Sequence, residues 1–248
     1  MIDEKLQELG TLINQYETKE LKPKEKQGKK KPMWDQVLSS ATATAETSYS
    51  AAAINYRVLA VDRFYQRLSG VQFKNTACGP TSGAMIFDYY YDVKGYNVRD
   101  NAYFGGDANT SVARLINHLT VEMNTSGTIG TYMSDWINGM YTHTRETTSA
   151  FSRVTVSNLD SDSYGNSLKY RSAINNDNPA GLRFDRFSSF ESDGIEWHFL
   201  AGIGYDLSGI YAENLQVYYL DPDGSDSSVK KFDWSANDQD FVFAHLTR

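Results

Sequence analysis

The sequence has one cysteine, Cys78, among its 248 residues. A single cysteine excludes an internal disulfide and a structural zinc site of the usual multi-cysteine kind. There is no run of 18 or more apolar residues, so no segment is predicted to span a membrane. The start of the sequence is charged and lacks the apolar stretch of a signal peptide. These absences fit a cytoplasmic protein, and they also fit an exported protein whose signal has been removed.

Positive charge is scarce over most of the chain. The net charge is −7, but residues 1–32 carry eight Lys against six acidic residues, so the remainder carries −9. An acidic body excludes nucleic acid as the main partner, because phosphate binding needs a concentrated basic face. With 40% apolar and 22% charged residues, the chain is predicted to be globular.

Residues 1–52 are predicted to be an N-terminal extension of a globular domain that spans residues 53–248. The extension begins with an amphipathic helix over residues 2–20, and residues 22–32 form a solvated linker with six Lys and two Pro. A propeptide, a docking arm and a spacer all fit this composition.

The domain is predicted to be α+β, with helices first and antiparallel strands second. A strand over 56–66 precedes helices over 78–91, 109–119, 129–141 and 166–175. The strands that follow cover 181–187, 196–205, 215–220, 229–234 and 241–246, separated by turn signals. This order differs from the alternation of a doubly wound parallel sheet.

Cys78 is predicted to be a nucleophile because it stands at the start of a helix. Pro80 fits the first turn, where a missing N–H costs nothing. A helix N-terminus lowers the pKa of a thiol, and the thiolate is the reactive form. Gly79 and small residues further along the helix let another segment approach closely. Gln72, six residues earlier, is predicted to donate its side-chain amide to an oxyanion, alongside the Cys78 backbone N–H.

His198 is the predicted base. His118, His143 and His245 fit packed or surface positions better. In the strand over 196–205, His198 shares a face with two glycines, and we expect the helix that carries Cys78 to pack there.

Asp221 is predicted to orient His198. If the strands over 196–205 and 215–220 form a hairpin symmetric about residue 210, His198 lies beside residue 221 or 222. A carboxylate there accepts from the imidazole and fixes its tautomer.

Other catalytic patterns are absent from the sequence. It has no G-x-S-x-G, H-E-x-x-H or P-loop motif. The acidic group of Asp221, Asp223 and Asp226 is a possible cation site by composition, but the sequence predicts no metal and no cofactor.

The motifs as a set resemble a known family. Gln72, ACGPTSGAM at 77–85, WHFLAGIGYD at 197–206 and YYLDPDG at 218–224 resemble the papain-like cysteine peptidases. The bacterial branch that includes double-glycine leader peptidases is the most similar. The resemblance implies a helical lobe and an antiparallel β lobe with a cleft between them, and a Cys78–His198–Asp221 triad with Gln72 as oxyanion donor.

Two departures limit the resemblance. Leader peptidases are usually fused to a transporter, so we do not expect an export-coupled role. Asp221 stands where papain-type enzymes typically have Asn, but either side chain accepts from the imidazole.

The predicted activity is hydrolysis of peptide bonds in a peptide or protein substrate. A papain-fold acyl or amide transferase and a catalytically silent binding module are the alternatives. Similar stand-alone bacterial proteins are often exported, so we expect an extracellular or cell-surface location, with the cytoplasm as the alternative. The sequence does not predict an oligomeric state.

Overall fold

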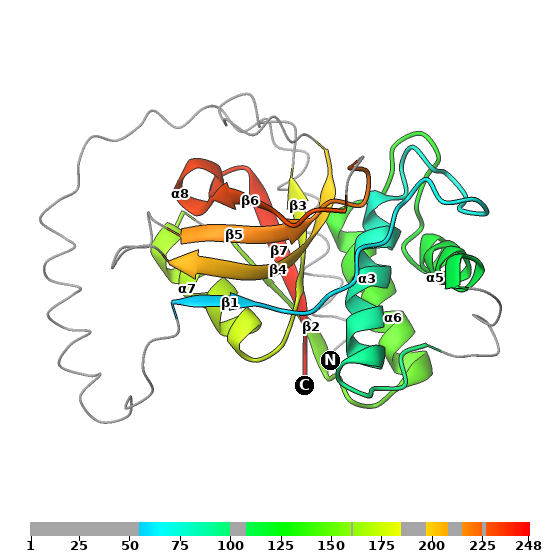
Figure 1. Ribbon diagram of the computed structural model, residues 1–248, viewed down its shortest axis with the longest axis horizontal. Helices are drawn as coiled ribbons and strands as arrows, with labels where there is room; N and C mark the ends of the chain where they lie inside the picture. The colour runs from blue at the N-terminus through cyan, green and yellow to red at the C-terminus, as the bar shows by residue number, and fades with distance from the viewer. Residues whose placement is uncertain (1–54, 100–107, 160, 185–196, 208–214, 225–226) are drawn as a thin grey trace, which may run out of the picture.

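The computed structural model describes residues 55–99, 108–159, 161–184, 197–207, 215–224 and 227–248 (Figure 1). The predicted N-terminal extension over residues 1–52 lies outside these residues. The described helices are α3 (Cys78–Asp92), α5 (Ala108–Glu122), α6 (Met133–Thr147), α7 (Ser163–Asn175) and α8 (Trp234–Asn237). The described strands are β1 (Tyr56–Val58), β2 (Arg153–Ser157), β3 (Ala180–Phe184), β4 (Phe199–Leu207), β5 (Leu215–Leu220), β6 (Lys230–Asp233) and β7 (Phe241–Thr247). The fold is therefore α+β, as predicted.

The seven described strands form one antiparallel sheet, six of them in the order β2-β7-β3-β4-β5-β6, with β1 beside β4. Strand β4 is its centre. On one edge β4 pairs with β5, and on the other it pairs first with β3 and then, beyond Gly202, with β1. The ends of β4 and β5 that carry the predicted site residues therefore lie at the same end of the sheet.

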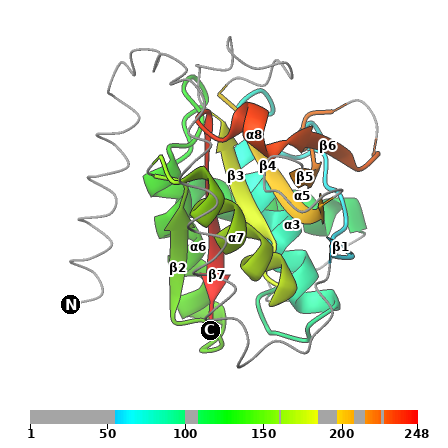
Figure 2. The same ribbon diagram turned by 90° about the vertical axis from the view of Figure 1, so that its left-hand side faces the viewer.

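Helices α3, α5 and α6 pack together beside the sheet, and α3 and α6 both contact it (Figure 1). Helix α3 contacts α5 and α6 as well as β3 and β4. Helix α7 crosses the sheet instead and contacts β1 to β4 (Figure 2). This is the two-lobed arrangement of a papain-like fold. None of the described helices is both long and apolar enough to cross a bilayer.

Helix α3 is buried on every side over its first thirteen residues. A helix that is apolar all round belongs inside a protein, and small residues let its neighbours approach. A Cβ atom at Gly79 would lie 2.6 Å from Thr131 Oγ1, and one at Gly83 would lie 2.8 Å from Met123 Cε. The prediction that these small residues permit close packing is confirmed.

The core is continuous between the helices and the sheet. The ring of Trp136 in α6 stacks on Phe199 in β4, with centroids 6.1 Å apart. Gly181 in β3 makes room for the same indole, since a Cβ there would lie 2.4 Å from Trp136 Cζ2. Helices and sheet therefore pack as one body around the start of α3.

Several predicted elements differ from the observed ones. The strand predicted over 56–66 ends at Val58, because the chain then leaves the sheet edge and the Gln66 N–H donates to Pro222 O. The helix predicted over 129–141 begins at Met133 instead, after a turn in which Gly130 has a φ of 90°. Strand β2 and the one-turn helix α8 were not predicted.

Candidate active site

Cys78 is the first residue of α3 and is 8% exposed. Its backbone N–H is one of the four at a helix start that have no partner within the helix. Trp136 holds the start of the helix in place: its Nε1 donates to Gly79 O at 3.1 Å and lies 3.2 Å from Ser82 Oγ. The sulfur is thus held at the positive end of a rigid, buried helix.

His198 immediately precedes β4, and the residue before it, Trp197, has a φ of 45°. His198 Nε2 lies 2.8 Å from Asp221 Oδ1, so the imidazole donates to the carboxylate through this nitrogen. Its side chain also interacts with that of Cys78, which raises the pKa of the imidazole. With Nε2 engaged by Asp221, Nδ1 is the nitrogen left for the sulfur. The three side chains that the sequence selected are therefore joined in the order Cys78, His198, Asp221.

The shifted pKa values of Cys78 and His198 favour a thiolate beside an imidazolium. Burial raises the pKa of the Cys78 thiol, but the hydrogen bond and charge of His198 outweigh burial and hold that pKa below its usual range. The backbone N–H groups of Phe199 and Gly79 act in the same direction. Burial lowers the pKa of His198, yet the hydrogen bonds to Asp221 and Cys78 raise it to about 10.

Asp221 is held as a carboxylate by several donors. Burial raises its pKa, but His198, the Asp223 N–H and Lys230 together hold the pKa well below the usual range for aspartate. The Asp223 N–H donates to Oδ1 at 2.9 Å, and Lys230 Nζ lies 3.2 Å from Oδ2. Oδ1 therefore accepts a hydrogen bond from the imidazole, while Oδ2 accepts one from Lys230.

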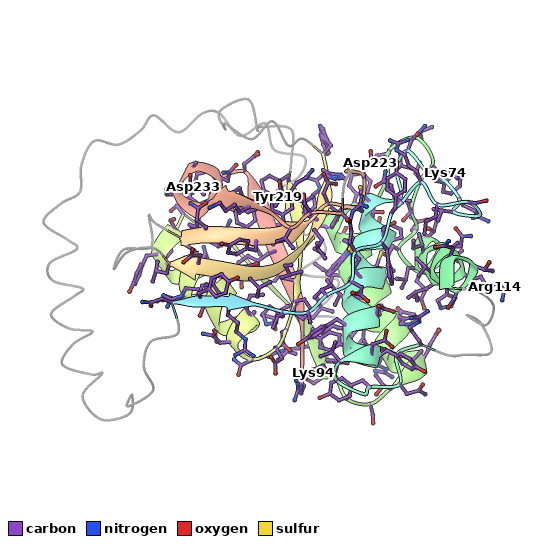
Figure 3. All side chains as sticks on the ribbon, in the orientation of Figure 1. Lys74, Lys94, Arg114, Tyr219, Asp223 and Asp233 are labelled. Carbon is purple, nitrogen blue, oxygen red and sulfur yellow. The ribbon has the colours of Figure 1, made fainter. Side chains whose placement is uncertain are left out.

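The turn that carries Asp221 is clamped by a segment just before the cysteine helix. Arg63 donates to the backbone carbonyl oxygens of Asp221, at 2.8 Å from Nε, and of Gly224. Arg67 pairs with Asp223 through both carboxylate oxygens, with 2.7 Å between Nη2 and Oδ2. Asp223 lies at the end of the sheet nearest the first turn of α3, and Lys94 lies beyond the other end of that helix (Figure 3). Asp221 and Asp223 therefore already have protein cations as partners, and Asp226 lies outside the described residues.

Gln66 and Gln72, both in the loop before Cys78, differ in burial. Gln72 is exposed, and its backbone N–H donates to Asn117 Oδ1 at 2.8 Å. Gln66, which was not among the predicted site residues, is 1% exposed. Its backbone N–H donates to Pro222 O, and its side-chain Nε2 donates to Lys74 O at 2.9 Å. Gln66 is thus tied both to the turn of the aspartate and to the loop before the cysteine.

The packing expected around β4 was wrong in one respect. The glycines on the predicted face of His198 do not receive the cysteine helix. A Cβ at Gly202 would meet the hydroxyl of Tyr170 in α7, and one at Gly204 would meet the backbone of β1. A bulge between Gly202 and Gly204 interrupts the simple alternation that the prediction assumed.

The register of the hairpin also differs from the prediction. Ala201 pairs with Leu220 and Tyr205 with Val217, an offset of one residue before the bulge and two beyond it. Asp221 still reaches His198, because each residue stands just outside its strand at the same end of the sheet.

The other three histidines lie apart from this arrangement. His245 is in β7, where burial and the charge of Arg153 lower its pKa to about 4, so it is neutral near pH 7. His118 and His143 meet at Glu122, between α5 and α6.

Comparison with known protein families gives a match. The family model described as Peptidase_C39 like family matches residues 58–243, three quarters of the chain. Among curated proteins, none matches the chain. The matched span includes Cys78, His198 and Asp221, together with both glutamines.

Proposed function

The chain belongs to the Peptidase_C39 like family, papain-like cysteine peptidases related to bacteriocin leader peptidases, and from this premise we propose that it is an active peptidase. The observation that carries the proposal is the hydrogen bond between His198 and Asp221 beside Cys78, whose sulfur interacts with His198 and stands at a helix N-terminus. A buried structural cysteine needs none of these partners.

In the proposed reaction the Cys78 thiolate attacks the carbonyl carbon of a peptide bond, and the C=O electron pair moves to oxygen. The His198 imidazolium then gives its proton to the amide nitrogen as the C–N bond breaks and the amine leaves. The neutral imidazole next takes a proton from water, whose oxygen attacks the thioester. The C–S bond breaks, the acid product leaves, and thiolate and imidazolium are restored.

The oxyanion needs two donors that are already in position before the reaction. The backbone N–H of Cys78 supplies one. The sequence predicts Gln72 as the other, but the exposure of Gln72 and the burial of Gln66 favour Gln66. An amide nitrogen carries two hydrogens, so Gln66 Nε2 retains one N–H beyond its bond to Lys74 O.

The direct test is cleavage of an unfolded protein substrate by the wild-type chain and by Cys78→Ala. We expect the variant to lose cleavage altogether while keeping the wild-type melting temperature within a few degrees. Equal cleavage by both proteins would refute the proposal.

Two measurements separate the alternatives. Adding a competing amine and analysing the products by mass spectrometry distinguishes hydrolysis, which gives the free acid, from acyl transfer, which gives the amide. A catalytically silent binding module predicts no covalent labelling of Cys78 by an epoxysuccinyl thiol reagent.

A further inference from the structure

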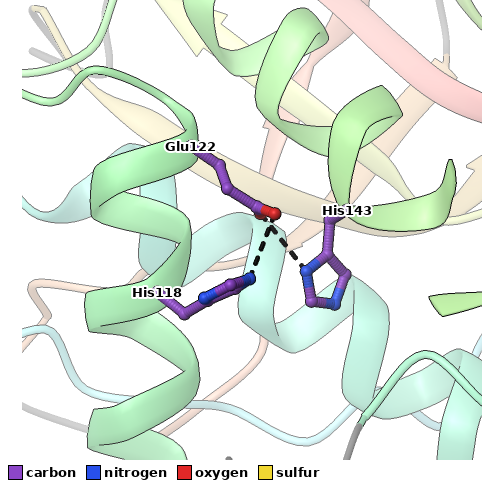
Figure 4. Close-up of side chains that lie close together, drawn as sticks. All are labelled: His118, Glu122 and His143. Carbon is purple, nitrogen blue, oxygen red and sulfur yellow. Dashed lines mark ion pairs between the residues drawn. The ribbon is translucent and has the colours of Figure 1, made fainter. Parts of the chain in front are cut away.

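A second cluster of chemically capable side chains lies in the helical lobe. His118 and Glu122 stand one turn apart on α5, and His143 comes from α6 (Figure 4). The Glu122 carboxylate points between the two imidazole rings, with Oε1 3.0 Å from His118 Nε2 and Oε2 3.2 Å from His143 Nδ1. One ligand atom of each residue lies within 4.8 Å of the others.

The cluster is largely withdrawn from water. The side chain of His143 is 1% exposed and that of Glu122 is 8% exposed, whereas His118 is 30% exposed. A carboxylate buried to this extent must be compensated by positive charge. Glu122 is also the last residue of α5, where the negative end of the helix dipole makes an uncompensated carboxylate still less favourable.

The tautomer of His143 is set by its other nitrogen. Nε2 lies 2.8 Å from Val98 O, and a carbonyl only accepts, so Nε2 carries a hydrogen. In the neutral ring Nδ1 then presents a lone pair toward the carboxylate, which repels it unless a proton or a cation lies between them. A backbone carbonyl that receives the far N–H of a histidine is the usual outer partner of a metal ligand.

The separations within the cluster suit a metal ion as well as a direct ion pair. Tetrahedral zinc, with bonds of about 2.0–2.2 Å, separates its ligand atoms by roughly 3.3–3.6 Å. The two ion-pair distances of 3.0 Å and 3.2 Å are slightly shorter than this, and all the ligand atoms lie within 4.8 Å of one another.

We propose that His118, Glu122 and His143 bind one divalent transition-metal ion, best matched by Zn²⁺, which ties α5 to α6. Two imidazoles and one carboxylate suit zinc, whereas Ca²⁺ and Mg²⁺ prefer oxygen ligands alone. The partial exposure of His118 gives the ion a route in and leaves a coordination position for water. Phe87 of α3 packs on the ring of His143, with centroids 4.4 Å apart, so the role is structural support of the helix that carries the cysteine.

The test uses the full chain, stripped of metal with a chelator and then dialysed against Zn²⁺ or Co²⁺. We expect one equivalent of Zn²⁺ per chain, visible d–d bands with Co²⁺, and a higher melting temperature with metal bound. His118→Ala is the main variant, because a partly exposed side chain is removed with least risk to folding. Since even an outer-shell change costs about 10–100-fold in affinity, loss of this ligand should weaken binding by at least ~100-fold.

Two matched controls keep the outcome decisive. Cys78→Ala tests coordination by the only thiol, and His245→Ala tests a buried histidine outside the cluster; both should bind Zn²⁺ like the wild type. If the wild type fails to bind one equivalent of Zn²⁺, the three side chains are held together by proton-mediated contacts alone, and the proposal is overturned. Unchanged affinity in His118→Ala would overturn it equally. Because Cys78→Ala is expected to bind metal, the proposal stands or falls independently of peptidase activity.

Discussion

The pairing of Cys78 with His198 predicts how fast the thiol is alkylated at each pH. In the wild type the imidazolium holds the pKa of Cys78 below its usual range, so a larger share of the thiol is ionised at pH 7 than in a free cysteine. His198→Ala removes the interaction with the imidazole and its charge. A thiol with an ordinary pKa of about 8.5 is only about 3% thiolate at pH 7, so the rate there should fall, by up to about 30-fold. Burial of the sulfur raises its pKa and would enlarge this loss.

The assay is the second-order rate of iodoacetamide alkylation from acid to alkaline pH, with His245→Ala as a matched control. We expect the wild type and the control to share a reactive plateau that extends well below pH 8. His198→Ala should show a single rise near the free-thiol pKa. The same single rise in all three proteins would refute the thiolate–imidazolium pair and turn attention to the binding-module alternative.

Three further outcomes follow from the structure. Asp221→Asn removes the carboxylate that raises the pKa of the imidazole to about 10, so the alkaline limb of the cleavage profile should move to lower pH; an unmoved limb in a pH–rate profile would contradict this. Gln66→Ala should reduce kcat about 10²–10³-fold, as loss of an oxyanion donor does, whereas Gln72→Ala should change kcat little. The reverse ranking in steady-state kinetics would show that Gln72 is the oxyanion donor. Gly181→Ala drives a methyl group into the indole of Trp136 and should lower the free energy of unfolding in urea by about 1–3 kcal/mol. Val121→Ala, at a position 76% exposed, should change it by less than about 0.5 kcal/mol. Equal stability of the two variants would argue against this packing.

The local sequence was informative where neighbouring residues decide the structure. The start of α3 at Cys78 was predicted because a helix start depends on a few adjacent residues, and Pro80 occupies the first turn as expected. The bounds of β5 were also predicted, since its apolar run ends directly at an Asp-Pro turn. The α+β order followed from the same kind of local pattern.

The pairing of His198 with Asp221 was predicted through a hairpin whose register was off by one or two residues. The geometry survives because both residues lie beyond the strand ends, where a small shift along the strands still leaves side chains within reach. The prediction of which side chains share a face of β4 failed, because the bulge between Gly202 and Gly204 breaks the alternation of side chains along the strand. Nothing in the sequence marks that bulge apart from the glycines themselves.

The sequence by itself determined the chemistry available to this protein: one cysteine at a helix start, a histidine and an aspartate at the ends of two consecutive strands, and an acidic body without a basic face. Tertiary structure alone distinguished Gln66 from Gln72, because two glutamines in one loop look alike until one of them is buried. It also brought His143 to Glu122, which no spacing could indicate, since they belong to different helices. Burial and contacts between distant segments depend on how the whole chain packs, whereas helix starts and turns depend on a few neighbouring residues.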